Sequence, residues 1–235
     1  HDIERLSEVS KLGSDRTRTR ARALAKGGRT NVYGFVLRLA ARLAAITPEL
    51  PVLSEEHEAG HARAVRGQWR EYWLVDPLDG TKEFISRNGE FTVNIALIAQ
   101  GRPVMGVVTV PAQGVSYWAW QGGGAFRRQR GDAAAQRLHV AVPREAGRPL
   151  RVMASKHHFH EDTRALINRM GTHELVQAGS SLKFCRIAEG AADVYPRLGP
   201  TCEWDTAAAQ AVVEAAGGHV CTLQGEPLRY GKTEV

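Results

Sequence analysis

The chain has 235 residues, of which 43% are hydrophobic and 24% are charged, and its formal net charge is +6. This length suits one large domain or two small lobes, and the composition excludes a disordered chain. No apolar run reaches the roughly 18–20 residues of a membrane span, and the first residues lack a signal-peptide pattern. We therefore expect a cytoplasmic protein, and leave open a peripheral attachment at the inner face of the membrane.

The positive charge is concentrated near the N-terminus. Residues 1–50 contain ten Lys or Arg and five Asp or Glu, and much of the excess lies in "KLGSDRTRTRARALAKGGR", residues 11–29. Such an arm is either a solvated segment or a contact for nucleic acid. It contains no aromatic residue on which a base could stack. We expect no nucleic-acid partner; the alternative predicts polynucleotide binding that falls steeply with salt.

The first half of the chain predicts a helix followed by strands. Residues 35–46 have apolar side chains at helical spacing, and residues 51–56 resemble a short strand that ends on acids. Residues 70–76 predict a strand that stops at Asp76, and residues 81–87 predict a short helix. Four further strands, separated by Gly, Pro and Asn signals, predict an antiparallel meander. They are residues 91–99, 104–110, 115–121 and 124–129.

The second half alternates between strands and helices, which is typical of an α/β lobe. The expected strands are residues 150–155, 173–178, 192–197 and 219–224. The expected helices are residues 161–170, 181–190 and 205–216. Residues 142–149 are the best boundary, so we predict an α+β lobe over 1–146, with an atypical basic segment at 1–34, and an α/β lobe over 147–235. The three cysteines, Cys185, Cys202 and Cys221, are interpreted as reduced thiols, two of them in the core.

The stretch "WLVDPLDGTKEF", residues 73–84, places two acids at a strand-to-helix turn. Each of Asp76 and Asp79 alone is readily explained as a turn or capping residue. Two carboxylates held together, however, repel each other unless a cation lies between them, and Mg²⁺ prefers such oxygen ligands. Gly80 and Thr81 then open a helix, whose N-terminus can bind an anion. Together these features indicate a metal-dependent phosphatase.

Two further acidic positions could join this site. Glu55 and Glu56 end the preceding strand, and Asp205 lies at the start of the last predicted helix, where a structural alternative is a helix cap. If these acids converge on Asp76 and Asp79, they could bind two or three divalent ions. Such ions orient a water, lower its pKa and stabilise the leaving oxygen.

The motifs resemble those of a known family. "DPLDGTKEF" follows an upstream "SEE" and precedes "NGEFTVNIALI", "GSSLKFC" and "YPRLGPTCEWDTAAAQAVVEAAGG". In this order they resemble the inositol-monophosphatase-like, lithium-sensitive phosphatases, and within them the CysQ-type 3'(2'),5'-bisphosphate nucleotidases. The resemblance implies a layered αβαβα sandwich and Mg²⁺-dependent hydrolysis of 3'-phosphoadenosine 5'-phosphate to AMP and phosphate, as in sulfate assimilation. The sulfated analogue remains open as a substrate, and inositol or sugar phosphates are the alternative.

The resemblance also implies roles for individual residues in catalysis and metal binding. Glu55, Asp76 and the carbonyl of Leu78 would hold one Mg²⁺. Asp76, Asp79 and Asp205 would hold the second, and a third ion would lie near Glu55. Gly80 and Thr81 would bind the phosphate that is cleaved.

The remainder of the nucleotide requires other contacts. The resemblance implies that Ser180, Lys183 and Arg197 hold the second phosphate, to which the Arg fork is well matched. Lys183 could instead be a surface lysine whose stem lies along the helix. His157 is expected to line the nucleotide pocket, with an exposed histidine as the alternative.

One motif of the family is missing from this sequence. Its pattern Asp-x-Ser-x-x-Thr-x-x-Asp, which is thought to activate the nucleophilic water, should precede the position of Glu55. The corresponding window, Ala25 to Tyr33, contains no acid. Loss of a positioned base typically lowers the rate by about 10²–10⁴. A nucleotide-binding protein with impaired catalysis is therefore a further alternative.

Overall fold

The computed structural model describes residues 30–55, 66–142, 147–156 and 161–232. The basic arm, Glu56 and His157 lie outside these ranges. The elements in chain order are α2 (Thr30–Ile46), β1 (Val52–Ser54), β2 (Glu71–Asp79), α4 (Thr81–Ser86), β3 (Thr92–Ala99), β4 (Arg102–Val110), β5 (Val115–Trp120), β6 (Gly124–Gln129), β7 (Gln136–Leu138), β8 (Leu150–Ser155), α5 (Glu161–Arg169), β9 (His173–Ala178), α6 (Leu182–Ala188) and α7 (Glu203–Ala215).

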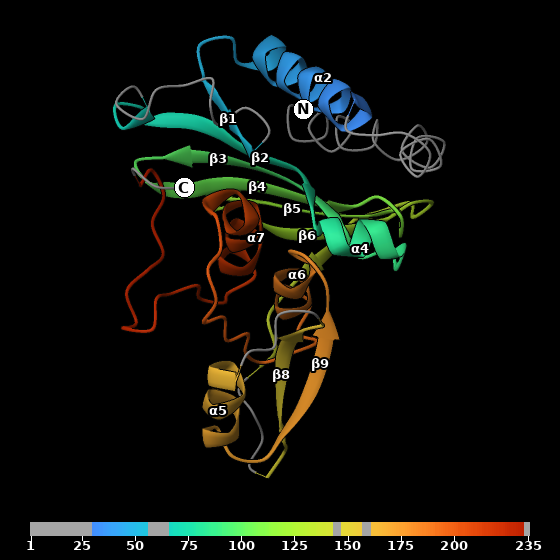
Figure 1. The fold of residues 1–235 in the computed structure, drawn as a ribbon, viewed down its shortest axis with the longest axis vertical. Helices are drawn as coiled ribbons and strands as arrows, with labels where there is room; N and C mark the ends of the chain where they lie inside the picture. Colours follow the sequence, from blue (N-terminus) through green and yellow to red (C-terminus); the bar gives the residue numbers. More distant parts are fainter. Residues whose placement is uncertain (1–29, 56–65, 143–146, 157–160, 233–235) are drawn as a thin grey trace.

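A seven-stranded sheet contains most of the strands, in the order β1-β2-β3-β4-β5-β6-β7 (Figure 1). β1 and β2 are parallel, and each later pair is antiparallel. The meander predicted over residues 91–129 is therefore confirmed, and β7 adds one strand to it. In β5, buried and half-buried residues alternate, as expected for a strand with one face on the core.

Strand β2 is buried on both faces because helices cover the sheet from both sides. On one face Trp73 packs with Leu39 and Leu43 of α2. On the other face Tyr72 belongs to the larger core, which includes α7. An apolar strand fixed in this way gives the acids at its end a rigid support.

Helix α7 lies directly on the sheet although it comes late in the chain (Figure 1). Gly106 of β4 permits this contact, because a Cβ at that position would lie only 2.2 Å from the carbonyl oxygen of Ala208. Ala208 and Ala211, three residues apart on one face of the helix, are the residues nearest Gly106, and their small side chains allow the close approach. The start of α7, with Asp205, is thereby brought to the sheet of the first half.

The strands β8 and β9 form a separate parallel pair beside α5 and α6. The strands predicted over 192–197 and 219–224 are wrong, since each range forms only one isolated bridge, Val152 with Val194 and Cys221 with Pro227. Near Val194, the Asp193 carboxylate accepts a hydrogen bond from the backbone N–H of Arg151. A side chain thus replaces part of the ladder. Residues 217–229 are mostly exposed, and the segment folds back on itself with backbone bonds from Thr222 to Glu226 and from Leu228 to Val220, which is too short a pairing for a strand.

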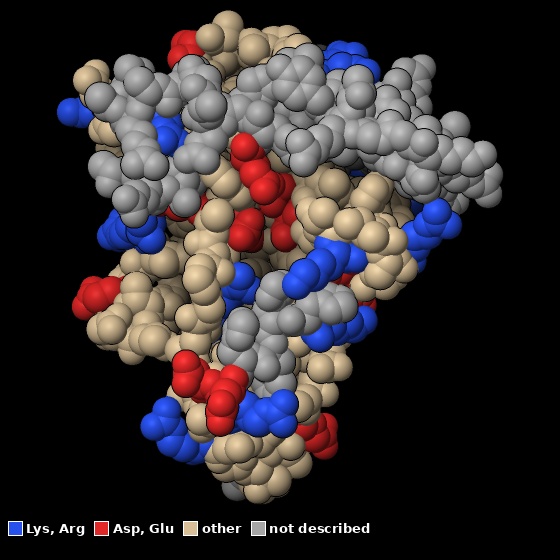
Figure 2. Space-filling view, viewed as in Figure 1, with Lys and Arg blue, Asp and Glu red and all other residues tan. Residues whose placement is uncertain are grey.

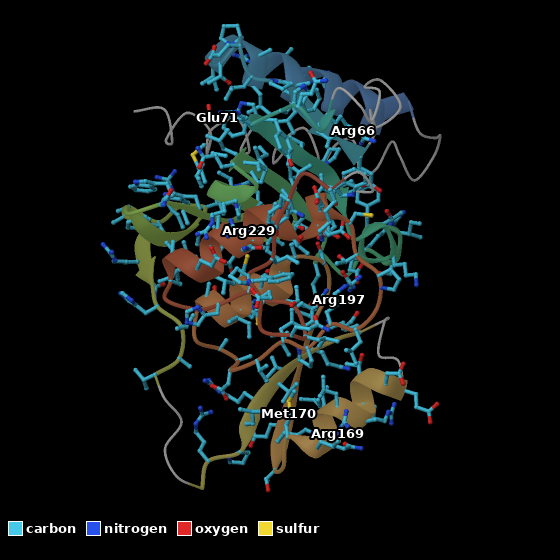
Figure 3. The ribbon with its side chains drawn as sticks, turned by 90° about the vertical axis from the view of Figure 1, so that its left-hand side faces the viewer. Arg66, Glu71, Arg169, Met170, Arg197 and Arg229 are labelled. Atoms are coloured by element: carbon cyan, nitrogen blue, oxygen red, sulfur yellow. The ribbon has the colours of Figure 1, made fainter. Side chains whose placement is uncertain are left out.

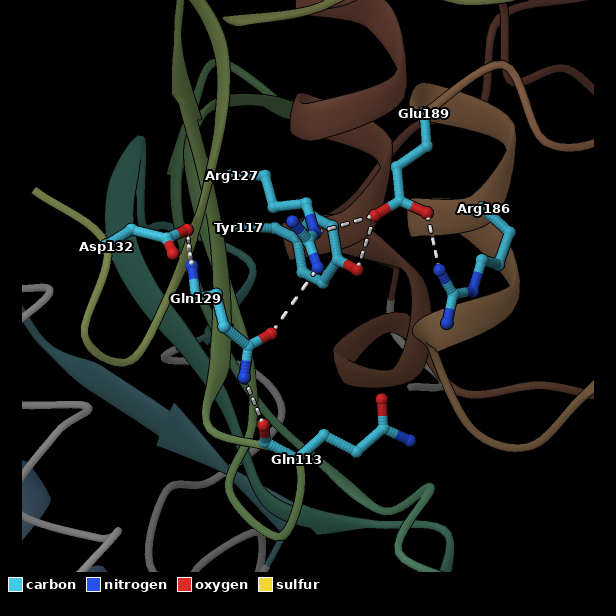
Figure 4. A network of polar contacts seen from close by, with 7 residues as sticks. All are labelled: Gln113, Tyr117, Arg127, Gln129, Asp132, Arg186 and Glu189. Carbon is cyan, nitrogen blue, oxygen red and sulfur yellow. Dashed lines mark hydrogen bonds and ion pairs between the residues drawn. The ribbon is translucent and has the colours of Figure 1, made fainter. Parts of the chain in front are cut away.

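Helix α6 is fastened to the sheet through Glu189 (Figure 4). Its Oε1 accepts a hydrogen bond from the Tyr117 hydroxyl at 2.7 Å and forms an ion pair with Arg127 at 3.0 Å. Its Oε2 pairs with Arg186 at 2.6 Å. These contacts hold the C-terminal end of α6, and the opposite end of the helix points to the acids of β2.

No helix in the described ranges is both long enough and apolar enough to cross a bilayer. The cysteines are free, with Cys185 buried, Cys202 half-buried and Cys221 exposed. The expectation of two core cysteines is therefore wrong.

Candidate active site

The two acids of β2 reach the same place through an irregularity in the strand. Asp76 pairs with Asn94 and Asp79 with Thr92, and the register shifts between these pairs. The prediction that the strand stops at Asp76 is wrong, because β2 continues to Asp79. Within the irregularity, the N–H of Leu78 donates to Asp76 Oδ1 at 2.9 Å. An extra residue in a strand resets its alternation, so side chains three apart can point to one side.

Three carboxylates converge at this point. Oxygen atoms of Asp76, Asp79 and Asp205 all lie within 4.8 Å of one another. Asp76 is 1% exposed. Burial, followed by the charges of Asp79 and Glu55, raises the pKa of Asp76 well above its ordinary range. Burial and Asp79 likewise raise the pKa of Asp205. Such crowded acids fit the oxygen-rich site that Mg²⁺ prefers, and a cation there would offset their repulsion.

One oxygen of Asp79 is saturated by hydrogen bonds from the segment before α6. Asp79 Oδ2 lies 2.6 Å from the Ser180 hydroxyl, 2.6 Å from the Ser181 hydroxyl and 2.7 Å from the Ser181 N–H. Thr92 and Asn94 of β3 approach the same oxygen at 3.1 and 3.4 Å. These donors fix the orientation of the Asp79 carboxylate, as a metal ligand requires.

Asp205 combines two roles. It is the third residue of α7, and its Oδ2 accepts hydrogen bonds from the backbone N–H of Cys202 and the hydroxyl of Thr201. The cap suggested by the sequence is therefore confirmed. Because this carboxylate also belongs to the acidic cluster, capping and metal binding are compatible at one residue.

Gly80 and Thr81 lie beside the acids, as predicted. Gly80 caps α4 in a left-handed conformation with φ of 86°, and Thr81 is the first helical residue. Both line a cleft of about 280 Å³ between the sheet and the second half of the chain. Figure 2 shows acidic side chains gathered in a hollow of this face, with basic side chains beside them. The described residues that line it are Asp79, Gly80, Thr81, Lys82, Glu83, Ser155, Ser180, Ser181, Lys183, Phe184, Tyr195, Arg197, Thr201 and Asp205.

Lys183 lies inside this cleft and not on the surface. It is 5% exposed, so the surface-lysine alternative is wrong. Its Nζ donates to the carbonyl oxygen of Ser180 at 2.6 Å and lies 5.6 Å from the centre of the Tyr195 ring. Burial lowers the pKa of Lys183 to about 8. A buried ammonium of this kind is well suited to bind an anion.

Arg197 lies on the same side of the cleft, between the seven-stranded sheet and the β8–β9 pair (Figure 3). Its guanidinium donates to the carbonyl oxygen of Pro200 at 2.7 Å. The loop 195–200 also lines a second cavity of about 250 Å³, with Ser155 and Thr163 opposite. The cleft therefore continues past Arg197 toward α5. His157, the remaining predicted contact, lies outside the described residues.

Three residues that surround Asp79 were not among those predicted for the site: Thr92, Asn94 and Ser181. Thr92 and Asn94 belong to the quoted stretch "NGEFTVNIALI", and their spacing of two places both on one face of β3. Ser181 follows the predicted Ser180 directly. Polar residues within apolar segments were a sign of a functional role. That Thr92 and Asn94 both bind Asp79 becomes visible only in the pairing of β2 with β3.

Comparisons with known proteins agree with this geometry. The sequence model of the family described as "Inositol monophosphatase family" matches residues 37–235 of the chain. The 3'(2'),5'-bisphosphate nucleotidase CysQ of Escherichia coli (strain K12) is 50% identical over 192 residues, which cover 82% of this chain and 74% of the relative. The CysQ nucleotidase of Haemophilus influenzae is 37% identical over 197 residues, covering 83% and 72% of the two chains.

Among solved structures, CysQ from Bacteroides thetaiotaomicron, titled a bacterial member of the inositol monophosphatase family, superposes with a TM-score of 0.78. It is 36% identical, and the match covers 97% of this chain and 92% of that one. SuhB of Mycobacterium tuberculosis shares the fold at a TM-score of 0.66 and 24% identity, with coverage of 97% and 92%. The predicted fold and resemblance are confirmed: the chain belongs to the inositol monophosphatase family.

Proposed function

We propose that this protein is a Mg²⁺-dependent 3'(2'),5'-bisphosphate nucleotidase, which hydrolyses 3'-phosphoadenosine 5'-phosphate to AMP and phosphate. The observation that carries the proposal is the charge arrangement of the cleft. Three carboxylates gather beside Lys183 and Arg197, which line the same cleft. A nucleotide with two phosphates could use both groups, one phosphate with the metal that the acids hold and the other with the basic side chains. The 50% identity to nucleotidases named CysQ supports the same substrate. The proposal includes the 5'-phosphosulfate analogue as a second substrate.

The acids would hold the metal. Asp76, Asp79 and Asp205 form the centre of the proposed site, with Glu55 and the carbonyl of Leu78 as further ligands. We propose two or three ions, as the family resemblance implies. When bound, Mg²⁺ supplies a water of lowered pKa and stabilises the charge that develops on the leaving oxygen. In this proposal Asp76 and Asp79 are held at the end of the buried strand β2, and Asp205 is held in the first turn of α7.

The phosphates would bind to different parts of the cleft. The N–H groups at Gly80 and Thr81, with the Thr81 hydroxyl, would bind the phosphate that is cleaved. Lys183 and Arg197 would bind the 5'-phosphate, and His157 would contact the nucleoside. Ser180 was expected to contact this phosphate, but its hydroxyl is bonded to Asp79, so we now propose that it orients the metal ligand.

A second candidate is a nucleotide-binding protein with little turnover. It is favoured by the window Ala25–Tyr33, which contains none of the acids of the water-activating motif. A phosphatase for inositol or sugar phosphates is the third candidate. The buried Lys183 argues for a second anionic group and therefore against substrates with one phosphate, such as inositol 1-phosphate. The 50% identity to nucleotidases named CysQ favours the nucleotide over a sugar bisphosphate.

Phosphate release separates these candidates. The protein is incubated with Mg²⁺ and, in parallel, with 3'-phosphoadenosine 5'-phosphate, inositol 1-phosphate or fructose 1,6-bisphosphate, and each reaction has a chelator control. We expect the highest kcat/KM for the nucleotide. Preference for either of the other substrates would refute the nucleotide assignment. Tight nucleotide binding by calorimetry without turnover would instead support the impaired binding protein.

We further propose that the substrate lies between a lobe formed by residues 1–146 and a lobe formed by residues 147–235, and that the protein works in the cytoplasm. No described feature supports attachment at the inner membrane face. The expectation of no nucleic-acid partner stays a prediction, because the basic arm lies outside the described residues.

A further inference from the structure

We infer that Glu90, which lies outside the cleft lining, is a positioning residue for the metal site. It acts through the segment Gly179–Ser181, which in turn orients Asp79. This inference rests on the proposed function, because it concerns the affinity of the same acids for Mg²⁺. Glu90 is not among the described residues that line the cleft, although its charge acts on Lys183.

Glu90 links three parts of the chain. It precedes β3, and its backbone N–H donates to the side chain of Asn88 at 2.9 Å. Its Oε2 accepts a hydrogen bond from the backbone N–H of Gly179 at 2.8 Å, and its Oε1 pairs with Lys156 at 2.7 Å. The side chain is 16% exposed. A carboxylate with two separate partners on its two oxygens fixes both against the start of β3.

The segment that Glu90 holds has an unusual backbone. Ser180 has a φ of 54°, a left-handed conformation that residues other than glycine rarely adopt. Such a conformation persists only where the surroundings impose it. On the one side the Ser180 and Ser181 donors are bound to Asp79, and on the other side Gly179 is bound to Glu90. The segment is therefore held from both ends.

Packing leaves the segment little room to move in another direction. A Cβ on Gly179 would lie 2.4 Å from Cγ of Glu83, the buried acid of α4. Gly80 also approaches the segment closely, since a Cβ there would lie 3.0 Å from Cβ of Ser180. Asn94 and Lys183 also bond to this segment, at the Ser181 hydroxyl and the Ser180 carbonyl oxygen, and both belong to the surroundings of the site. Shortening or removing the Glu90 side chain would release the tether at Gly179, which lies on the side away from Asp79.

The consequence of that release is predicted at Asp79. With Gly179 untethered, Ser180 can relax from its left-handed conformation, and its hydroxyl and the Ser181 donors leave Oδ2. Asp79 then gains freedom to rotate, and its other oxygen no longer has a fixed direction toward the cation. Loss of a partner that orients a metal ligand typically weakens metal affinity by about 10–100-fold. Because Glu90 acts on Asp79 through an intervening segment, we expect the loss of its hydrogen bond to Gly179 to weaken Mg²⁺ affinity by about 5–20-fold.

Three variants separate the hydrogen bond from the charge. Glu90→Gln keeps the length of the side chain and an oxygen for Gly179, but loses the charge. Glu90→Asp keeps the charge but is one methylene shorter. Lys156→Met removes the ion pair and leaves the Gly179 bond intact. The Mg²⁺ dissociation constant is measured by calorimetry on the substrate-free protein, and kcat and KM are measured over a range of Mg²⁺ concentrations.

We expect Glu90→Gln and Lys156→Met to bind Mg²⁺ within about twofold of the unmodified chain, and Glu90→Asp to bind about 5–20-fold more weakly. At saturating Mg²⁺, kcat of Glu90→Asp should recover, which a general loss of folded protein would not allow. Equal Mg²⁺ affinity in Glu90→Asp and the unmodified chain would overturn the inference. If Glu90→Asp does not fold, a more than fivefold loss in Glu90→Gln would overturn it instead.

These outcomes are distinct from failure of the proposed function. Mg²⁺ binding by the unmodified chain without turnover of any nucleotide would refute the nucleotidase alone. The affinities of the Glu90 variants would still decide the positioning role.

Discussion

Replacing Lys183 by Met tests the proposed recognition of the second phosphate. The ammonium is 5% exposed and lies among cleft residues, so a phosphate bound to it would be largely shielded from water. Hydrogen bonds to charged groups contribute about 1.5–3 kcal/mol, and their loss should raise KM for 3'-phosphoadenosine 5'-phosphate about 10- to 150-fold. Met keeps a similar length and fills the space of the lysine stem, so the cleft should keep its shape.

The matched control is a substrate that lacks the 5'-phosphate. For 3'-AMP the same substitution should change kcat/KM less than about twofold, because the group that Lys183 contacts is absent. Comparing two enzymes with two substrates isolates this one contact, as a double-mutant cycle does. An equal loss with both substrates would show that Lys183 serves the cleaved phosphate or the fold, and the reasoning would then be refuted.

The pH dependence gives an independent check of the same contact. Burial lowers the pKa of Lys183 to about 8, so the side chain is charged below that pH and neutral above it. The ratio of kcat/KM for the bisphosphate to that for 3'-AMP should fall roughly tenfold between pH 7 and pH 9. Since catalytic groups affect both substrates, they cancel in the ratio. In Lys183→Met the ratio should be low and independent of pH.

The same lysine should lower the stability of the folded protein at neutral pH. Its pKa is lowered from 10.5 to about 8 on folding, and below pH 8 both states are charged, so the full cost of burial is present. The difference between these two pKa values corresponds to a loss of about 3 kcal/mol in the free energy of unfolding. Stability should therefore rise between pH 8 and about 10 as the folded protein loses this proton. Lys183→Met should not lower Tm at pH 7, although the bond to the Ser180 carbonyl is lost.

Other substitutions test the metal site and the packing beneath it. Asp79→Asn should lower kcat by more than about a hundredfold, since a metal ligand is lost, and near-normal rates would contradict that assignment. Gly106→Ala should destabilise the fold by about 3 kcal/mol or more, as the new methyl would meet the backbone of Ala208; an unchanged Tm would show that α7 can move away. Gly80→Ala should cost about 1–2 kcal/mol, because φ is 86° and the new Cβ would approach Ser180. Thermal melts with and without Mg²⁺ would measure the stability of the Gly106→Ala and Gly80→Ala variants. We expect Gly80→Ala also to lower activity.

The sequence predicted the parts of this protein that depend on local pattern. Alternating apolar residues identified the strands of the meander, and Gly80 marked the start of α4. The acids were recognised because two carboxylates three residues apart at a strand end are unusual. Local pattern failed at residues 192–197, where backbone pairing with β8 is limited to the bonds of Asp193 and Val194 with Arg151 and Met153, and the Asp193 carboxylate takes the N–H of Arg151.

The surroundings of Asp79 could not be predicted because they depend on contacts between distant segments. The hydroxyl of Ser180 reaches Asp79 across 101 positions of sequence, and that of Thr92 reaches it across 13. The irregularity in β2 is similar, since its effect on the direction of Asp79 depends on the register with β3. Composition and spacing indicated a metal site, but they did not indicate which residues make its geometry rigid.

The charges of the cleft explain why metal and nucleotide suit the same site. Three carboxylates within 4.8 Å repel one another, and burial disfavours the charge on Lys183, which Asp79 offsets only in part. Crowding of the acids and burial of the lysine both cost free energy in the protein alone. In the proposed complex a divalent cation balances the charge of the acids, and the 5'-phosphate balances the charge of Lys183 and Arg197. A ligand with one phosphate would leave one of these two groups without its partner. The cost of keeping both groups charged in the free protein is therefore itself an argument for a bisphosphate substrate.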